Sequence, residues 1–102
     1  MKINEIIQEN KEDLTQLVLV KFSTSLQQLS EYFDKSVAYY ASNKNSQVKV
    51  RLVHVLQKIQ KEIEIILVDD MWQVNSDDPD VEETFNEFVT LNNAIEDYLV
   101  TL

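Results

Sequence analysis

The sequence of 102 residues contains no glycine and no cysteine, and it has one proline and one histidine. Glycine supplies the positive φ angles on which tight β-hairpins and phosphate-binding loops depend, so a chain without it is poorly suited to a β-architecture or a nucleotide-binding loop. The absence of cysteine excludes disulfides, thiolate zinc sites and cysteine nucleophiles, and it fits a cytoplasmic protein. The single histidine leaves little material for a metal site of several histidines or for a catalytic triad.

Long hydrophobic runs are also missing. The longest wholly apolar stretches, residues 17–20 and 65–68, are four residues long, whereas roughly 20 residues are needed to span a membrane. The first residues do not resemble a signal peptide. Hydrophobic residues make up 44% of the chain and charged residues 26%, which is typical of a folded protein. We therefore expect a single domain over residues 1–102 with a core of modest size.

Basic residues are absent after Lys61. Residues 1–61 contain nine bases and six acids, whereas residues 62–102 contain twelve acids and no base, and the net charge of the chain is −9. The last five bases, between residues 44 and 61, follow one another with no acid among them. A strongly acidic surface repels nucleic acid and anionic membranes, so we expect neither as a direct partner. The charge favours a basic protein as the partner.

Apolar residues recur at intervals of three, four and seven along the first half of the chain, which predicts a long amphipathic helix. The residues of this apolar seam are Leu19, Phe22, Leu26, Leu29, Phe33 and Tyr40. No glycine or proline interrupts residues 11–41, and we interpret Ser23–Ser25 as the polar side of one continuous helix. The alternative is a break in the chain, with Ser25 capping a new helix. A second apolar stripe predicts a short N-terminal helix, with Asn10 capping the helix that follows.

The second half of the chain predicts two further helices. Residues 42–46 form a polar turn, and apolar residues at helical spacing indicate a helix over residues 47–72. Asp78 is a good N-cap and Pro79 suits the first position of a helix, so the last helix is expected over residues 79–101.

One polar residue, Asn92, lies on the heptad seam of the last helix, where it would fix the register at some cost in stability. Short turns between helices make neighbouring helices antiparallel. The sequence therefore predicts an all-α fold, a small antiparallel bundle of three long helices plus a short N-terminal helix, or four helices if the chain breaks near Ser23–Ser25.

Two stretches of the sequence partly match known functional motifs but differ from them at particular residues. His54 flanks the apolar seam, and Gln57 and Lys58 stand where a histidine phosphotransfer helix has lysine and glycine, so we interpret His54 as an ordinary residue beside the seam. Residues 76–87 space their carboxylates somewhat like a calcium loop, but Val81 stands where that loop requires glycine. We expect no metal site, no cofactor and no enzymatic activity.

The stretch from residue 68 to residue 88 contains eight carboxylates, the single tryptophan, the single proline and no lysine or arginine. The acids from Asp78 to Glu83 suit the positive N-terminus of a helix. Asp69 and Asp70 are not explained in this way, because they lie near the C-terminus of the helix expected over residues 47–72, where the helix dipole disfavours negative charge. A basic partner that compensates their charge would explain them.

Antiparallel helices would bring these acids to one end of the bundle, near the turn at residues 73–78, and would draw Lys44, Lys49, Arg51 and Lys58 toward the other end. The candidate partner-binding residues are Asp69, Asp70, Trp72, Asp77, Asp78, Asp80, Glu82, Glu83 and Glu87. Trp72 has two interpretations: a hydrophobic plug at the end of the bundle, which we favour, or a partly exposed anchor for the partner.

Two functional hypotheses follow from this distribution of charge. The first is a non-catalytic acidic binding protein, an inhibitor of the immunity, antitoxin or anti-defence type, which docks on a basic surface such as that of a nuclease or a nucleic-acid-binding protein. The alternative is a structural or adaptor helical protein that forms homo-oligomers through its heptad seams.

Overall fold

The computed structural model describes residues 11–102 of the chain. These residues form three long helices, α2 (Lys11–Ser42), α3 (Ser46–Leu67) and α4 (Pro79–Thr101), and one short 3-10 helix, η1 (Asp70–Asn75). No strand occurs within residues 11–102, so the prediction of an all-α bundle is confirmed. The expected N-terminal helix and the cap at Asn10 lie outside the described residues.

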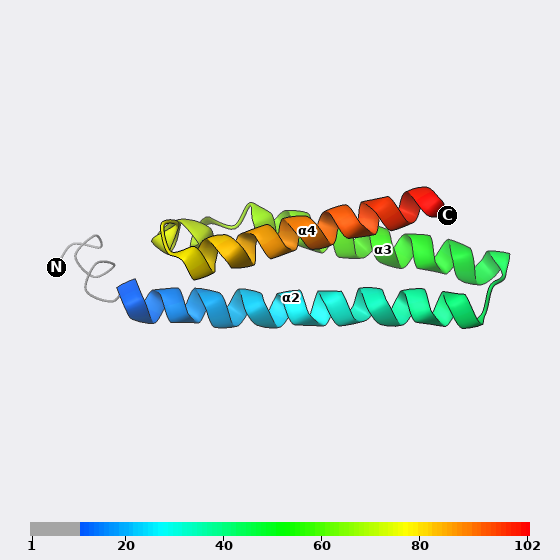
Figure 1. Ribbon diagram of the computed structural model, residues 1–102, viewed down its shortest axis with the longest axis horizontal. Helices are drawn as coiled ribbons and strands as arrows, with labels where there is room; N and C mark the ends of the chain where they lie inside the picture. Colours follow the sequence, from blue (N-terminus) through cyan, green and yellow to red (C-terminus); the bar gives the residue numbers. More distant parts are fainter. Residues whose placement is uncertain (1–10) are drawn as a thin grey trace.

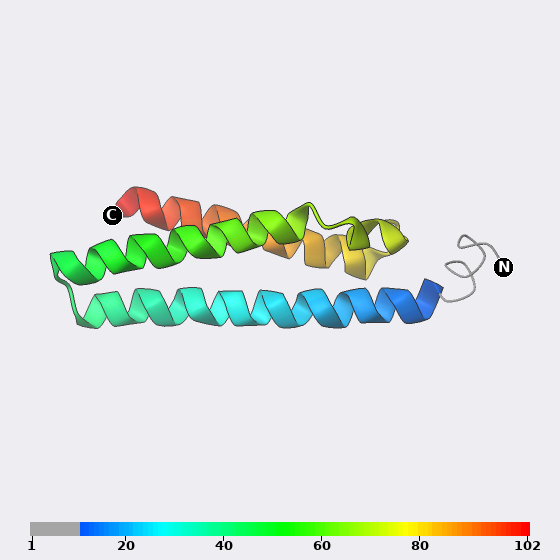
Figure 2. The same cartoon turned by 180° about the vertical axis from the view of Figure 1, so that it is seen from behind.

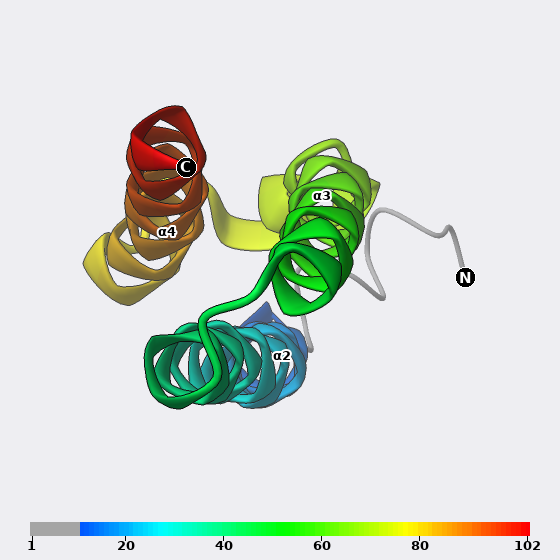
Figure 3. The same cartoon turned by 90° about the vertical axis from the view of Figure 1, so that its right-hand side faces the viewer.

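The three long helices pack around one apolar core. α2 and α3 are antiparallel neighbours, as are α3 and α4, and α4 therefore runs parallel to α2 (Figure 1, Figure 2). Seen along the bundle, the three helices stand at the corners of a triangle (Figure 3). The molecule measures 60 × 20 × 18 Å. One end is formed by η1 and the starts of α2 and α4, and the other end by the turn at residues 43–45 and the end of α4 (Figure 1).

α2 is continuous through its serine-rich segment. The hydroxyl of Ser25 donates a hydrogen bond to the carbonyl of Lys21, one turn earlier, at 3.1 Å, so its polar group is paired within the helix. The interpretation of Ser23–Ser25 as part of one helix is confirmed, and the alternative of a break at this place is wrong.

The core is apolar and follows the predicted seams. Its buried residues are Val18, Phe22, Leu52, Leu56, Ile59, Ile63, Trp72, Val81, Phe88 and Ile95. Near the end of the bundle that contains η1, Phe22 stacks on Trp72 and meets Phe88 edge to face. Toward the opposite end, Phe33 of α2 and Tyr98 of α4 meet edge to face at 6.0 Å. Aromatic contacts therefore join α2 to α4 at two levels of the bundle.

α3 ends at Leu67, five residues before the end that the sequence predicted. Asp69 has extended backbone angles and accepts a hydrogen bond from the amide of Met71 at 2.8 Å, so it caps η1 instead of continuing α3. The indole nitrogen of Trp72 donates to the carbonyl of Ile66 at 2.7 Å, which satisfies a carbonyl at the end of α3. The prediction of one helix over residues 47–72 is wrong: the amide of Asp69 bonds to the carbonyl of Ile66, three residues earlier, where a continuing α-helix would bond to Ile65.

α4 begins and ends where the sequence predicted. The carboxylate of Asp78 accepts hydrogen bonds from the amides of Asp80 and Val81, and Pro79 is the first helical residue. Asn92 is half-buried, and its side-chain oxygen is buried without a hydrogen-bond partner. The prediction that Asn92 interrupts the apolar seam of this helix is confirmed.

Candidate functional site

We call the end of the bundle that contains η1, the turn at residues 76–78 and the first turns of α4 the acidic pole (Figure 1). All nine candidate partner-binding residues lie between residues 69 and 87 and so belong to this end. The structure assigns different environments to them. Three have structural contacts within the fold, and six are exposed.

Asp69 is compensated within the molecule. Besides capping η1, its carboxylate lies 3.8 Å from the ammonium of Lys21 on α2. Asp69 lies two residues beyond the end of α3, as expected near a helix C-terminus, and it also lies at the N-terminus of a 3-10 helix, which favours negative charge. Asp70 is likewise in the first turn of η1, and its side chain is exposed. Asp69 and Asp70 both lie at the start of η1, and not in the last turn of α3, because α3 ends at Leu67.

Trp72 is buried, with 7% of its surface exposed, so its interpretation as a plug at the end of the bundle is confirmed. Its ring stacks on Phe22 of α2 with centroids 4.0 Å apart, and it meets Phe85 and Phe88 of α4 edge to face at 5.2 and 5.9 Å. Its hydrogen bond to the carbonyl of Ile66 is a contact with α3. One side chain of η1 thereby contacts all three long helices.

A second polar contact connects η1 to α2. The side-chain amide of Asn75 donates to the hydroxyl of Thr15 at 3.1 Å, and Thr15 is buried. Asp78, the third structural residue of the candidate set, is half-buried and caps α4. These contacts connect η1 to α2 and fix the start of α4 beneath the exposed carboxylates.

The other six candidate acids are exposed and form no ion pair or side-chain hydrogen bond. They are Asp70, Asp77, Asp80, Glu82, Glu83 and Glu87. Within residues 14–102, the single ion pair is the one between Lys21 and Asp69. The acidic pole therefore presents carboxylates that are not neutralised by ion pairs with side chains of residues 14–102.

An apolar depression of about 220 Å³ lies among these acids, between η1 and α4. Trp72, Val81 and Phe85 contribute its apolar walls, and Gln73, Ser76 and Glu82 complete its lining. The sequence did not indicate this depression, because a helix running to residue 72 leaves no place for η1. The sequence did contain one indication of η1, since an aspartate two residues before Met71 can cap a helix. The apolar spacing along α3 instead favoured one longer helix.

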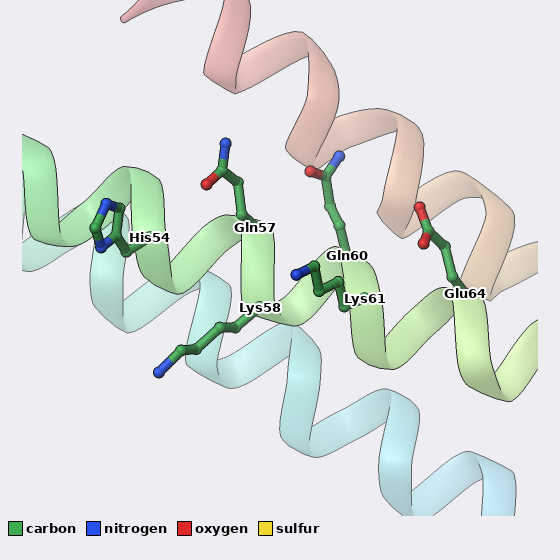
Figure 4. Close-up of a pocket in the computed structure, with 6 residues that line it drawn as sticks. All are labelled: His54, Gln57, Lys58, Gln60, Lys61 and Glu64. Carbon is green, nitrogen blue, oxygen red and sulfur yellow. The ribbon is translucent and has the colours of Figure 1, made fainter.

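His54 is exposed on the outer face of α3, beside a hollow of about 540 Å³ that this helix alone lines. Figure 4 shows the side chains of the hollow spread along one helix, with their polar ends apart from one another. Among the residues that the structure describes, no group of three or more histidine, aspartate or glutamate side chains is placed to bind a metal ion.

Comparison with protein-family models, with curated proteins and with solved structures finds no match for this chain. No helix within residues 11–102 combines the length and the apolar composition that crossing a bilayer requires.

Proposed function

We propose that this protein is a non-catalytic acidic binding protein of the cytoplasm, an inhibitor of the immunity, antitoxin or anti-defence type, whose acidic pole docks on a basic protein surface. A nuclease or a nucleic-acid-binding protein is the class of partner that the charge favours. The observation that carries the proposal is the set of six exposed, unpaired carboxylates beside an apolar depression.

The charges and the depression contribute in different ways to such a complex. Clustered carboxylates attract a basic surface over about one Debye length, which accelerates association and disfavours acidic competitors. The depression beside Trp72 and Phe85 accepts an apolar side chain, and burial of apolar surface slows dissociation. Both elements adjoin η1, whose Trp72 packs against the long helices.

The contact residues in this proposal are fewer than the sequence suggested. Asp69, Trp72 and Asp78 support the acidic pole from within, as an ion-paired cap, a buried plug and a helix cap. The six exposed acids are the charged groups that would meet the partner, and Trp72 would meet it only as a wall of the depression.

Exposed apolar side chains favour the alternative of a homo-oligomer. More than half of the surface of eight large hydrophobic side chains is exposed, among them Leu17, Val20, Ile65 and Val100. The heptad seams themselves pack within one chain, since Phe22, Phe88 and Ile95 are buried. An oligomer would therefore use apolar residues outside the seams.

The test compares two double variants that each remove two negative charges. Glu83→Gln with Glu87→Gln changes the acidic pole, and Asp34→Asn with Asp97→Asn changes exposed acids elsewhere that have no hydrogen-bond or ion-pair partner. The unchanged protein is used to retain proteins from an extract at low salt. The retained proteins are eluted with a salt step and identified, and their binding kinetics are then measured. We expect a basic partner whose association slows about 3- to 10-fold with the first variant and less than about 2-fold with the second. Acidic or neutral partners, or equal effects of the two variants, would refute the proposal.

A further inference from the structure

A second surface, at the opposite half of the molecule, has the complementary charge. A groove of about 310 Å³ runs between α2 and α3 near the turn that joins them. Its apolar lining consists of Tyr32, Tyr39, Val48, Leu52 and Val55. α4 packs against both α2 and α3 (Figure 3). The groove opens to solvent, since Tyr32, Tyr39 and Arg51 in its lining are exposed.

Two tyrosines form one edge of the groove. Tyr32 and Tyr39 are seven residues apart on α2, so they lie on the same face of the helix, and 55% and 61% of their surfaces are exposed. Neither phenol forms a hydrogen bond in the fold. Half-exposed tyrosines beside an apolar floor are typical of protein-binding surfaces, because they bury a large area at a low cost in side-chain entropy.

Two cations line the same groove, one from each helix. Lys35 of α2 and Arg51 of α3 are exposed, and neither forms an ion pair. Lys58 follows Arg51 by two helical turns on α3 and is also exposed. The groove therefore combines an apolar floor with positive charge, whereas the depression at the acidic pole combines apolar walls with negative charge.

The charge of the groove distinguishes among its possible occupants. Two copies of the chain packed face to face on the groove would bring Lys35 and Arg51 of both copies into one contact, and four cations in a desolvated contact cost free energy. A partner segment with carboxylates would instead form ion pairs with them. Two antiparallel helices offer a groove whose shape accepts a further helix, as in a four-helix bundle.

We infer that this groove binds an amphipathic helix of another protein, with apolar residues at positions i, i+3 or i+4, and i+7 and with carboxylates beside them. The apolar residues contact Tyr32, Tyr39 and Val55, and the carboxylates pair with Lys35 and Arg51. The inference does not depend on the function proposed for the acidic pole, since the two surfaces share no residue.

The first experiment selects ligands without assuming their charge. A phage library of random peptides of about 16 residues, enough for four helical turns, is selected on the full-length protein. Peptides that also bind the variant Tyr32→Ala with Tyr39→Ala are removed. Because this variant keeps Lys35 and Arg51, the step does not select peptides by their charge. We expect the remaining peptides to be acidic, with apolar residues at helical spacing. If none remain, or if the remaining peptides are neutral or basic, the inference is wrong.

The second experiment tests the cations directly. Calorimetry of one selected peptide should show binding at least about 10-fold weaker to Arg51→Glu and to Lys35→Glu than to the unchanged protein. Lys61→Glu is the matched control, because Lys61 is exposed on α3 and does not line the groove, and its effect should stay below about 2-fold. Equal effects of Arg51→Glu and Lys61→Glu would contradict the inference. So would a dimer in light scattering that Arg51→Glu dissociates, because a second copy would then occupy the groove.

Discussion

Asp69 and Asp70 are adjacent in sequence and differ in their contacts. Asp69 caps η1 and lies within ion-pair distance of Lys21, whereas the side chain of Asp70 is exposed and has no partner. Loss of an N-cap costs about 0.5–2 kcal/mol, and an ion pair this exposed adds little to that value. At the scale of single residues, charge alone does not indicate which acid supports the fold.

The first prediction separates these two residues. Asp69→Ala should lower the free energy of unfolding by about 0.5–2 kcal/mol, because the amide of Met71 loses its acceptor. Asp70→Ala should change it by less than about 0.5 kcal/mol, as is usual for an exposed side chain without contacts. Urea unfolding followed by circular dichroism measures both. Equal losses for the two variants would mean that Asp69 does not cap η1.

The second prediction concerns Asn92, whose side-chain oxygen is buried without a hydrogen bond. Asn92→Leu removes this unsatisfied group and adds apolar surface to the seam, so the free energy of unfolding should rise by about 1–2 kcal/mol. Asn93→Leu is the control, since Asn93 is exposed on the same helix and should give no such gain. Light scattering shows whether the association state changes as well. An unchanged stability for Asn92→Leu would place its side chain outside the core.

At the scale of helices, the sequence predicted α4 closely because its boundary chemistry is local. Asp78 and Pro79 specify the start of a helix through their own backbone and side-chain properties. The end of α3 combines local contacts with one that is distant in sequence. Asp69 caps η1 locally, whereas Trp72 of η1 stacks on Phe22, 50 residues earlier. Spacing along the chain carries no information about such a contact.

The third prediction tests the continuity of α2 at Ser25. In the interior of a helix, alanine is more favourable than serine by roughly 0.5 kcal/mol, whereas replacing an N-cap serine costs about 1 kcal/mol. Ser25→Ala should therefore raise the free energy of unfolding slightly, because the hydroxyl bonds only to the carbonyl of Lys21. Chemical denaturation at several urea concentrations gives the sign of the change. A loss of stability would favour the break that the structure excludes.

At the scale of the whole molecule, an elongated shape keeps surfaces of opposite charge apart. The radius of gyration is 17.1 Å, well above the value of about 13 Å for a compact chain of this length. The bundle is long enough to separate the acidic pole from the basic groove between α2 and α3 (Figure 1). The sequence predicted the position of the acids, because they are contiguous in the chain. It predicted the structural role of Asp78 as a cap, but not that of Asp69 or the apolar surface that adjoins the acids, since these two depend on η1.

The fourth prediction follows from the net charge of −9. Repulsion among the acids destabilises the folded chain, and salt screens it, so the urea midpoint should rise between about 0.01 M and 0.3 M sodium chloride. The variant with Glu83→Gln and Glu87→Gln lacks a like-charge pair one turn apart on α4 and should respond less to salt. A midpoint that falls with salt would indicate that attractive ion pairs dominate the stability.

Trp72 is the only tryptophan of the chain, and it borders the depression at the acidic pole. Its position makes the unlabelled protein an optical sensor of its own ligands. A partner that fills the depression changes the surroundings of the indole and so shifts or quenches its fluorescence emission. A helix bound between α2 and α3 meets Tyr32 and Tyr39 instead, and it would alter tyrosine emission while the tryptophan signal stays constant. Two excitation wavelengths on one sample would then reveal which end of the molecule is occupied.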